Sequence, residues 1–189
     1  MHVGWRSKCV AAAILVSAIA SMGAYPPEMP IQAPRLRILV LHGPNLNLLG
    51  RREPQIYGTT TLDQINERLA AAAKEINVEV ITMQSNSEGV LVDAFHKHID
   101  DVDGALINGA GLTFSSISLH DAIKAMPFPV IEVHISNLGT RDELHQRSVL
   151  TPAVRGAVMG LGWRSYTAAL RALTEIVREE KAAKASGKQ

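Results

Sequence analysis

Two stretches of the sequence hold the residue types that acid–base chemistry requires. Arg52 and Tyr57 lie within 41–58, and Glu132 lies two residues before His134. A free tyrosine has a pKa of about 10, but a nearby guanidinium favours the phenolate, which is a base. A carboxylate beside an imidazole holds one tautomer of the ring, as a general acid needs. The alternatives are a solvated arginine beside a packed loop tyrosine and, for the histidine, a satisfied core residue.

The elements that must position these residues alternate along the chain. Continuous apolar runs, typical of strands buried on both faces, alternate with segments of helical period. The strands are expected at residues 36–41, 78–83, 104–107, 129–135 and 154–159, and the helices at 62–72, 90–102, 116–125 and 163–184. This alternation predicts an α/β fold: a flavodoxin-like three-layer sandwich with a five-stranded parallel sheet of order 2-1-3-4-5.

Polar residues follow the first, third and fourth of these strands. Sheets of this kind bind ligands beyond the carboxyl ends of their strands, where the strand order reverses. Asn45 and Asn108 follow or end strands there, and either bind a substrate oxygen or shape a tight turn. Glu132 and His134 share one face of the fourth strand, because strand side chains alternate. The segment 41–58 is far longer than the usual connection of about 2–6 residues, and we interpret it as an active-site lid.

The first part of the chain differs from the rest in composition. Residues 1–24 have a basic start and an apolar, small-residue run, the pattern of a secretory signal peptide or, if uncleaved, a membrane-anchor leader. A proline-rich linker is expected at 25–35, a single catalytic domain at 36–184 and a disordered tail at 185–189. This pattern predicts a periplasmic or membrane-anchored protein. The alternative is a cytoplasmic protein whose true start is Met29.

Composition also excludes some classes of function. The formal net charge is only +1 and aromatic residues make up 4% of the chain. Neither value is typical of a nucleic-acid-binding protein. The one cysteine, Cys9, lies in the leader, so the rest of the chain has no disulfide and no cysteine-ligated metal.

Several motifs together resemble the type II 3-dehydroquinate dehydratase family over about residues 36–175. They are His42-Gly43-Pro44-Asn45-Leu46-Asn47-Leu48-Leu49-Gly50, Arg52-Glu53-Pro54, Tyr57-Gly58, Gln84-Ser85-Asn86-Ser87-Glu88-Gly89, Ile107-Asn108 and Glu132-Val133-His134-Ile135-Ser136-Asn137. The resemblance implies a flavodoxin-like subunit in a homododecamer built from trimers. It also implies an anti elimination of water from 3-dehydroquinate, giving 3-dehydroshikimate through an enolate, with no cofactor and no metal.

The resemblance further implies a role for each matching residue. Tyr57 would take the C2 proton with Arg52 favouring its phenolate, Asn45 would hold a water on the enolate, and Glu132 would orient His134, which protonates the departing hydroxyl. Arg141 would help shape the lid, and Asp121 would reach the site of a neighbouring subunit. The residues expected to bind substrate are Asn108, Phe114, Asp121, Ile135, Ser136, Arg141 and His145.

The chain departs from the family pattern at three positions. Phe114 stands where a histidine is usual, and His120 and His145 stand where arginines are usual. Losing a charge-assisted contact costs about 1.5–3 kcal/mol, and we hypothesise that His120 or His145 partly replaces the missing arginines. Two alternative functions stay open: dehydration of a related polyhydroxylated ring acid, and non-catalytic binding of such acids. Export would favour quinate catabolism over aromatic amino acid biosynthesis.

Overall fold

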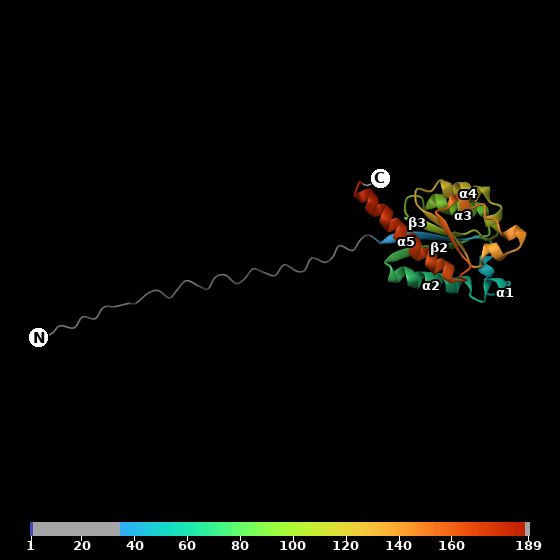
Figure 1. The fold of residues 1–189 in the computed structure, drawn as a ribbon, viewed down its shortest axis with the longest axis horizontal. Coiled ribbons are helices and arrows are strands. Elements are labelled where there is room, and N and C mark those ends of the chain that lie inside the picture. The colour runs from blue at the N-terminus through green and yellow to red at the C-terminus, as the bar shows by residue number, and fades with distance from the viewer. Residues whose placement is uncertain (2–34, 188–189) are drawn as a thin grey trace. The chain divides into compact units, whose positions relative to one another are not determined.

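Five parallel strands in the order β2-β1-β3-β4-β5 form the centre of the domain (Figure 1). The computed structural model describes residues 35–187 and Met1, so the predicted leader and nearly all of the linker lie outside the described residues. The strands are β1 (Leu36–His42), β2 (Val78–Gln84), β3 (Gly104–Asn108), β4 (Val130–His134) and β5 (Gly156–Met159). The predicted fold class and strand order are confirmed.

Helices cover both faces of this sheet, with α2 and α5 on one side and α3 and α4 on the other (Figure 1). The helices are α1 (Pro54–Tyr57), α2 (Leu62–Glu75), α3 (Glu88–Lys97), α4 (Ile117–Lys124) and α5 (Arg164–Ala185). Short 3-10 turns occupy Leu46–Leu48, Ala110–Phe114, Leu138–Thr140, Glu143–His145 and Thr151–Ala153. No helix among residues 35–187 is long and apolar enough to cross a membrane.

The expected bounds of α3 and β5 were wrong by two residues or more. α3 begins at Glu88 and ends at Lys97, although apolar residues keep a helical spacing as far as Val102. Val102 is buried, but it follows the helix and packs into the core from the turn before β3. β5 begins at Gly156 instead of residue 154, because the Val154 amide still donates to the Thr151 carbonyl and closes the 3-10 turn Thr151–Ala153.

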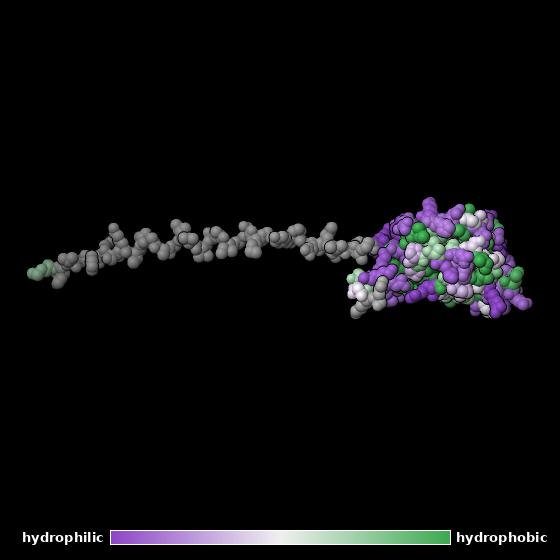
Figure 2. Space-filling model, turned by 90° about the horizontal axis from the view of Figure 1, so that it is seen from above, coloured by the Kyte–Doolittle hydropathy of each residue, from purple (hydrophilic) through white to green (hydrophobic). Residues whose placement is uncertain are grey.

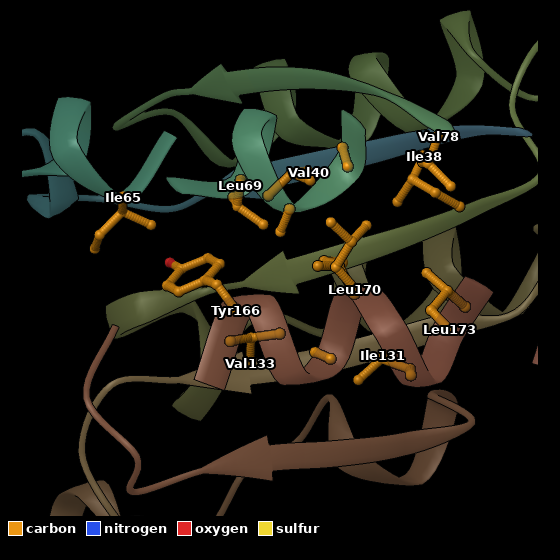
Figure 3. Packing of buried hydrophobic residues seen from close by; sticks show 14 of the residues in the cluster. Ile38, Val40, Ile65, Leu69, Val78, Ile131, Val133, Tyr166, Leu170 and Leu173 are labelled. Carbon is orange, nitrogen blue, oxygen red and sulfur yellow. The ribbon is translucent and has the colours of Figure 1, made fainter. Parts of the chain in front are cut away.

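Strand β1 explains why the sheet needs cover on both faces. Its side chains alternate between the two cores: Ile38 and Val40 pack with α2 and α5, and Leu39 and Leu41 pack with α3 and α4. All four are fully buried. Figure 3 shows the first of these cores, in which Leu170 and other residues of α5 face the sheet. Removing this apolar area from water on both sides fixes the sheet and with it the edge at which the strands end.

The lid leads into α2, whose start is fixed by a capping box. The Thr61 hydroxyl accepts from the Gln64 amide at 3.2 Å, and the Gln64 side chain accepts from the Thr61 amide at 3.1 Å. This reciprocal pair satisfies backbone donors that a helix start otherwise leaves free. The predicted capping box is therefore confirmed.

Candidate active site

One cavity of about 210 Å³ lies beyond the carboxyl ends of β1, β3 and β4. Ten of the twelve predicted site residues line it: Asn45, Arg52, Tyr57, Asn108, Phe114, His134, Ile135, Ser136, Arg141 and His145. The other two, Glu132 and Asp121, do not. The cavity therefore lies at the edge of the sheet that the strand-order rule predicts for a ligand. The residues that it gathers are separated by up to about a hundred positions in the sequence.

Tyr57 lies between two guanidinium groups at the end of α1. Arg141 Nη1 donates to the Tyr57 hydroxyl oxygen at 3.1 Å and to the Ser136 hydroxyl at 3.3 Å. Both guanidinium groups lie over the ring, with Cζ 5.2 Å from the centroid for Arg52 and 5.5 Å for Arg141. Arg52 makes no hydrogen bond to the hydroxyl, and its Nη2 is paired with the Glu53 carboxylate at 2.7 Å. The guanidinium that contacts the phenolic oxygen thus belongs to Arg141, whereas the sequence led us to expect Arg52 in that position.

His134 and Glu132 form a buried pair on β4. Their side chains lie on the same face, and His134 Nε2 is 2.8 Å from Glu132 Oε1. Glu132 also accepts hydrogen bonds from the Ser148 hydroxyl at 2.7 Å and from the Thr151 hydroxyl at 2.5 Å. Because the carboxylate can only accept, Nε2 of His134 carries a proton and Nδ1 is the ring nitrogen left for the pocket.

The environment of Glu132 keeps its carboxyl group ionised. Burial by itself raises the pKa of Glu132, but the hydrogen bonds from His134, Thr151 and Ser148 outweigh that effect and lower the pKa below its usual value. A buried carboxylate with three donors is well satisfied. It can therefore hold the imidazole of His134 in one orientation and stabilise a positive charge on it.

Asn45 enters the pocket from the start of the lid in a left-handed conformation, with φ of 66°. Its backbone amide donates to the side-chain oxygen of Asn86 at 2.9 Å, and Gln84 donates to the same oxygen at 3.0 Å. Asn and Asp tolerate this conformation better than other residues with a Cβ. The residues just after β2 thus support the turn that brings Asn45 to the site.

The wall of the pocket at Phe114 is partly apolar. The Phe114 ring meets the His145 ring edge to face, with centroids 5.0 Å apart and planes at 88°. His145 Nδ1 is in turn 2.7 Å from Asp142 Oδ1, and this hydrogen bond lowers the pKa of Asp142. His145 is therefore placed where it can contact a ligand, as the hypothesis about the missing arginines requires.

Asp121 and His120 lie outside this cavity, on α4. Asp121 is exposed, and both residues border a shallow surface hollow together with Ile117. His120 Nδ1 is 2.8 Å from the carbonyl oxygen of Val149. Neither residue can contact a ligand bound in the pocket of its own subunit.

Sequence reasoning gave no role to the residues that support the site from behind. They are Asn66, Gln84, Asn86, Ser148, Thr151 and Tyr166. Gln84 ends β2 and Asn86 follows it, and both belong to a motif quoted for the family resemblance. The others lie on helices or in a polar turn, where nothing in the spacing marks them. Among residues 35–187 there is no cluster of three or more His, Cys, Asp or Glu side chains arranged to hold a metal ion.

The fold and the pocket together define a class of protein: a flavodoxin-like α/β protein with acid–base residues at the carboxyl edge of its sheet. Comparison with known families narrows this class. Residues 36–174 match the model of the family described as dehydroquinase class II. The chain belongs to this family.

Individual relatives support the assignment. The chain is 47% identical over 141 residues to the 3-dehydroquinate dehydratase of Pelotomaculum thermopropionicum, covering 75% of this chain and 98% of the relative. It is 49% identical over 138 residues to the 3-dehydroquinate dehydratase of Nostoc sp., covering 73% of this chain and 94% of the relative. Among solved structures, the type II dehydroquinase from Propionibacterium acnes is similar with a TM-score of 0.70 and 41% identity, covering 75% of this chain and 96% of that one.

Proposed function

We propose that this chain is a type II 3-dehydroquinate dehydratase, which removes water from 3-dehydroquinate to give 3-dehydroshikimate. Its family and its relatives of the same name support the reaction. The observation that carries the mechanism is the presence of Tyr57 and His134 in one cavity, each with its own charged partner. A base and an acid with different partners can act in sequence on one substrate.

In the first step the phenolate of Tyr57 takes the proton from C2, next to the ring carbonyl. Arg141 donates to the phenolic oxygen and Arg52 lies over the ring, so two guanidinium groups lie beside the proposed base. The C–H bonding electrons move onto the carbonyl oxygen and form an enolate. Asn45 lines the same cavity and, in this proposal, holds the water that stabilises the enolate oxygen.

In the second step the enolate collapses to a C1–C2 double bond and the C1–O bond breaks. His134 gives a proton to the departing hydroxyl, which leaves as water. Glu132, which is ionised and fully buried, stabilises the imidazolium that donates this proton. Asn108 and the segment Ile135–Ser136 bind the substrate's polar groups, so the proton and the hydroxyl are both placed for elimination.

The experiment is a turnover assay on the purified chain without residues 1–34. With 3-dehydroquinate, absorbance of the conjugated enone product should rise without added metal or cofactor. Treatment with borohydride in the presence of substrate should leave the enzyme active, because this route forms no Schiff base. Binding of the substrate without any product would instead favour a binding protein.

A related ring acid is a second candidate substrate, because Phe114 and His145 form an edge-to-face pair in the wall of the cavity. An aromatic wall favours a substrate with fewer polar groups at that side. The kcat/KM for 3-dehydroquinate should be compared with that for an analogue lacking one ring hydroxyl. If one of these histidines replaces a missing arginine, His145→Ala or His120→Ala should lower kcat/KM for 3-dehydroquinate. Unchanged turnover in both variants would remove that idea.

The assembly proposed for this chain is a homododecamer built from trimers. Ile117 on α4 is 61% exposed, and it borders a shallow hollow together with Asp121. In this proposal the hollow, which Val149 and Pro152 also line, is the surface through which subunits meet. In such a trimer Asp121 reaches the site of the neighbouring subunit.

For localisation we propose the periplasm, or attachment to the membrane through an uncleaved leader, with quinate catabolism as the pathway. The basic start and apolar run of residues 1–24 support this. Cells that express the full chain should be fractionated, and the mass of the protein in each fraction should be measured. These data show where the protein is located and whether residues 1–24 have been removed. Intact protein in the cytoplasm, or translation from Met29, would favour aromatic amino acid biosynthesis.

A further inference from the structure

Behind the pocket, four polar side chains form a continuous row of hydrogen bonds. Asn108 Nδ2 lies 2.9 Å from the Tyr166 hydroxyl, which lies 3.2 Å from His42 Nδ1, and His42 Nε2 lies 3.0 Å from Asn66 Oδ1. Tyr166 and His42 are fully buried. Only Asn108 of the four lines the cavity. The other three cannot touch a substrate, so polar groups have been buried there for another reason.

The directions of these hydrogen bonds follow from what each atom can do. The backbone amide of Ala110 donates to Asn108 Oδ1 at 3.1 Å, and this contact identifies the oxygen end of the Asn108 amide. Nδ2 then donates to Tyr166, so the tyrosine proton must go to His42 Nδ1. The remaining proton of His42 lies on Nε2 and is donated to Asn66. Each donor in the row meets an acceptor.

Burial keeps the row in this single arrangement. It lowers the pKa of His42 to about 4, although the hydrogen bond to Asn66 opposes the effect. Burial also raises the pKa of Tyr166 above its usual value. Both side chains are therefore neutral at neutral pH. A charged His42 would carry two N–H donors, and the Tyr166 proton would lose its acceptor.

Four different elements supply the row, which makes it rigid. His42 and Asn108 are register partners on the neighbouring strands β1 and β3, Asn66 comes from α2 and Tyr166 from α5. Figure 3 shows Tyr166 at one end of the apolar core, with its hydroxyl turned away from Leu170 and Leu173. Apolar packing thus fixes the Tyr166 ring, and the hydroxyl of this ring fixes the Asn108 amide through their hydrogen bond.

We propose that Tyr166 and His42 are positioning residues that hold the Asn108 amide so that it presents an N–H to the substrate. The carbonyl oxygen of the amide is occupied by Ala110, and one N–H is occupied by Tyr166. The one N–H that remains is the group this side chain can offer in the cavity. The subsite at Asn108 therefore selects a hydrogen-bond acceptor, such as a carboxylate or hydroxyl oxygen of a ring acid. The identity of that acid rests on the function proposed above.

The test is Tyr166→Phe, which removes only the hydroxyl that holds Nδ2. Losing one neutral hydrogen bond corresponds to about a fivefold weaker interaction. We expect KM for 3-dehydroquinate to rise about fivefold and kcat to stay within about twofold. Quinate, which lacks the ring carbonyl and cannot react, should show the same rise in Kd by calorimetry. A loss of folded protein alone would lower kcat and leave KM and Kd unchanged.

Thr174→Val is the matched control, because Thr174 is a buried residue of the same helix whose hydroxyl donates to the Leu170 carbonyl. It should change neither KM nor Kd. A second pair of variants tests the row at His42. His42→Gln keeps one acceptor and one donor and should retain near wild-type KM, whereas His42→Leu should raise KM as Tyr166→Phe does. This pair decides the matter if Tyr166→Phe does not fold.

The outcomes separate this inference from the proposed function. If Tyr166→Phe and His42→Leu have the same KM for 3-dehydroquinate and the same Kd for quinate as Thr174→Val, the positioning role is overturned. A wild-type chain that binds quinate without dehydrating 3-dehydroquinate would overturn the proposed reaction, and the quinate Kd values would still test the row. A wild-type chain that does neither would overturn both.

Discussion

At the scale of single residues, the two arginines near Tyr57 are not equivalent. Arg141 contacts the phenolic oxygen at 3.1 Å, whereas Arg52 lies over the ring and is already paired with Glu53. In the proposed mechanism this oxygen takes the proton, so a hydrogen bond to it acts on the reacting atom itself. We therefore assign the larger share of base activation to Arg141. Sequence reasoning missed this because Arg141 lies 84 positions from Tyr57.

Replacing Arg141 by methionine should lower kcat/KM for 3-dehydroquinate by about 10- to 150-fold, the equivalent of about 1.5–3 kcal/mol for a hydrogen bond to a charged group. Arg141→Lys keeps the charge but not the planar fork, so it should recover only part of the loss. Steady-state kinetics measure both variants. Wild-type kcat/KM in Arg141→Met would contradict this assignment.

His42 makes a prediction about stability against pH. Its pKa is about 4 in the folded chain, below the usual value of 6.5. Between these two values the unfolded chain binds a proton that the folded chain does not. The free energy of unfolding therefore has its full value, as far as His42 is concerned, above about pH 6.5. It decreases as the pH falls from there towards 4. The partners of the ring, Asn66 and Tyr166, carry no charge that would oppose this.

Denaturant unfolding should show that the wild-type protein has a lower free energy of unfolding at pH 5 than at pH 7. Protonation of His42 in the unfolded chain should account for about 2 kcal/mol of this difference. His42→Gln cannot titrate, so its free energy of unfolding should fall by correspondingly less between the same two pH values. The comparison cancels the contributions of the other histidines and of Glu132. Parallel pH dependence in the two proteins would show that His42 is not held neutral.

At the scale of elements, the approach of β1 to β3 sets where the lid begins. Gly43 follows β1, and its amide donates to the Asn108 carbonyl at 2.8 Å. A Cβ at Gly43 would lie 2.4 Å from the carbonyl oxygen of Gly109. Beyond this contact the chain turns through two left-handed residues, Asn45 and Glu53, with φ of 66° and 39°. Glycine is therefore required where the two strand ends meet.

Gly43→Ala should push the start of the lid away from β3 and misplace Asn45 and Asn108 together. We expect a fall in kcat/KM of at least tenfold and a free energy of unfolding lower by about 1–3 kcal/mol, as overpacking typically costs. Gly89→Ala is the control, since a Cβ there meets nothing within 4 Å. Unchanged kinetics in Gly43→Ala would show that the strand ends can separate without harm.

The strands and helices also show which features of the fold and of the site could be predicted from the sequence. Hydrophobic periodicity predicted the strands, because burial on both faces leaves a strong pattern. The strand order and the edge where the pocket lies came from the fold class that the alternation of strands and helices indicated. The pairing of Glu132 with His134 followed from strand alternation. The contact of Arg141 with Tyr57 and the row through Tyr166 depend on how distant segments pack. The spacing of residues along the sequence does not predict contacts between such distant segments.

At the scale of the whole molecule, the proposed assembly requires a surface through which subunits can meet. The exposed large apolar residues of the described domain are Leu48, Val90, Ile117, Leu144 and Leu161. They are separated along the chain, and Figure 2 shows apolar residues among polar ones on the face that it presents. Of these five, only Ile117 borders the hollow that also contains Asp121. We therefore place the proposed trimer contact at α4.

Light scattering should give a mass of twelve subunits for the chain without residues 1–34. Ile117→Asp puts a charge into the proposed contact and should reduce the assembly to smaller species. If Asp121 completes a neighbouring site, kcat/KM should fall in the same variant, and Asp121→Asn should lower it without changing the mass. A wild-type monomer with full turnover would contradict the assembly.

We propose Tyr57 as the base in the dehydration of 3-dehydroquinate. The most direct measurement is the rate of enone formation by Tyr57→Phe, which keeps the ring but removes the oxygen that takes the proton. General base catalysis contributes about 10²- to 10⁴-fold, so kcat should fall by at least about a hundredfold while the Kd for quinate stays near that of the wild type. A Tyr57→Phe variant with wild-type kcat would contradict the account.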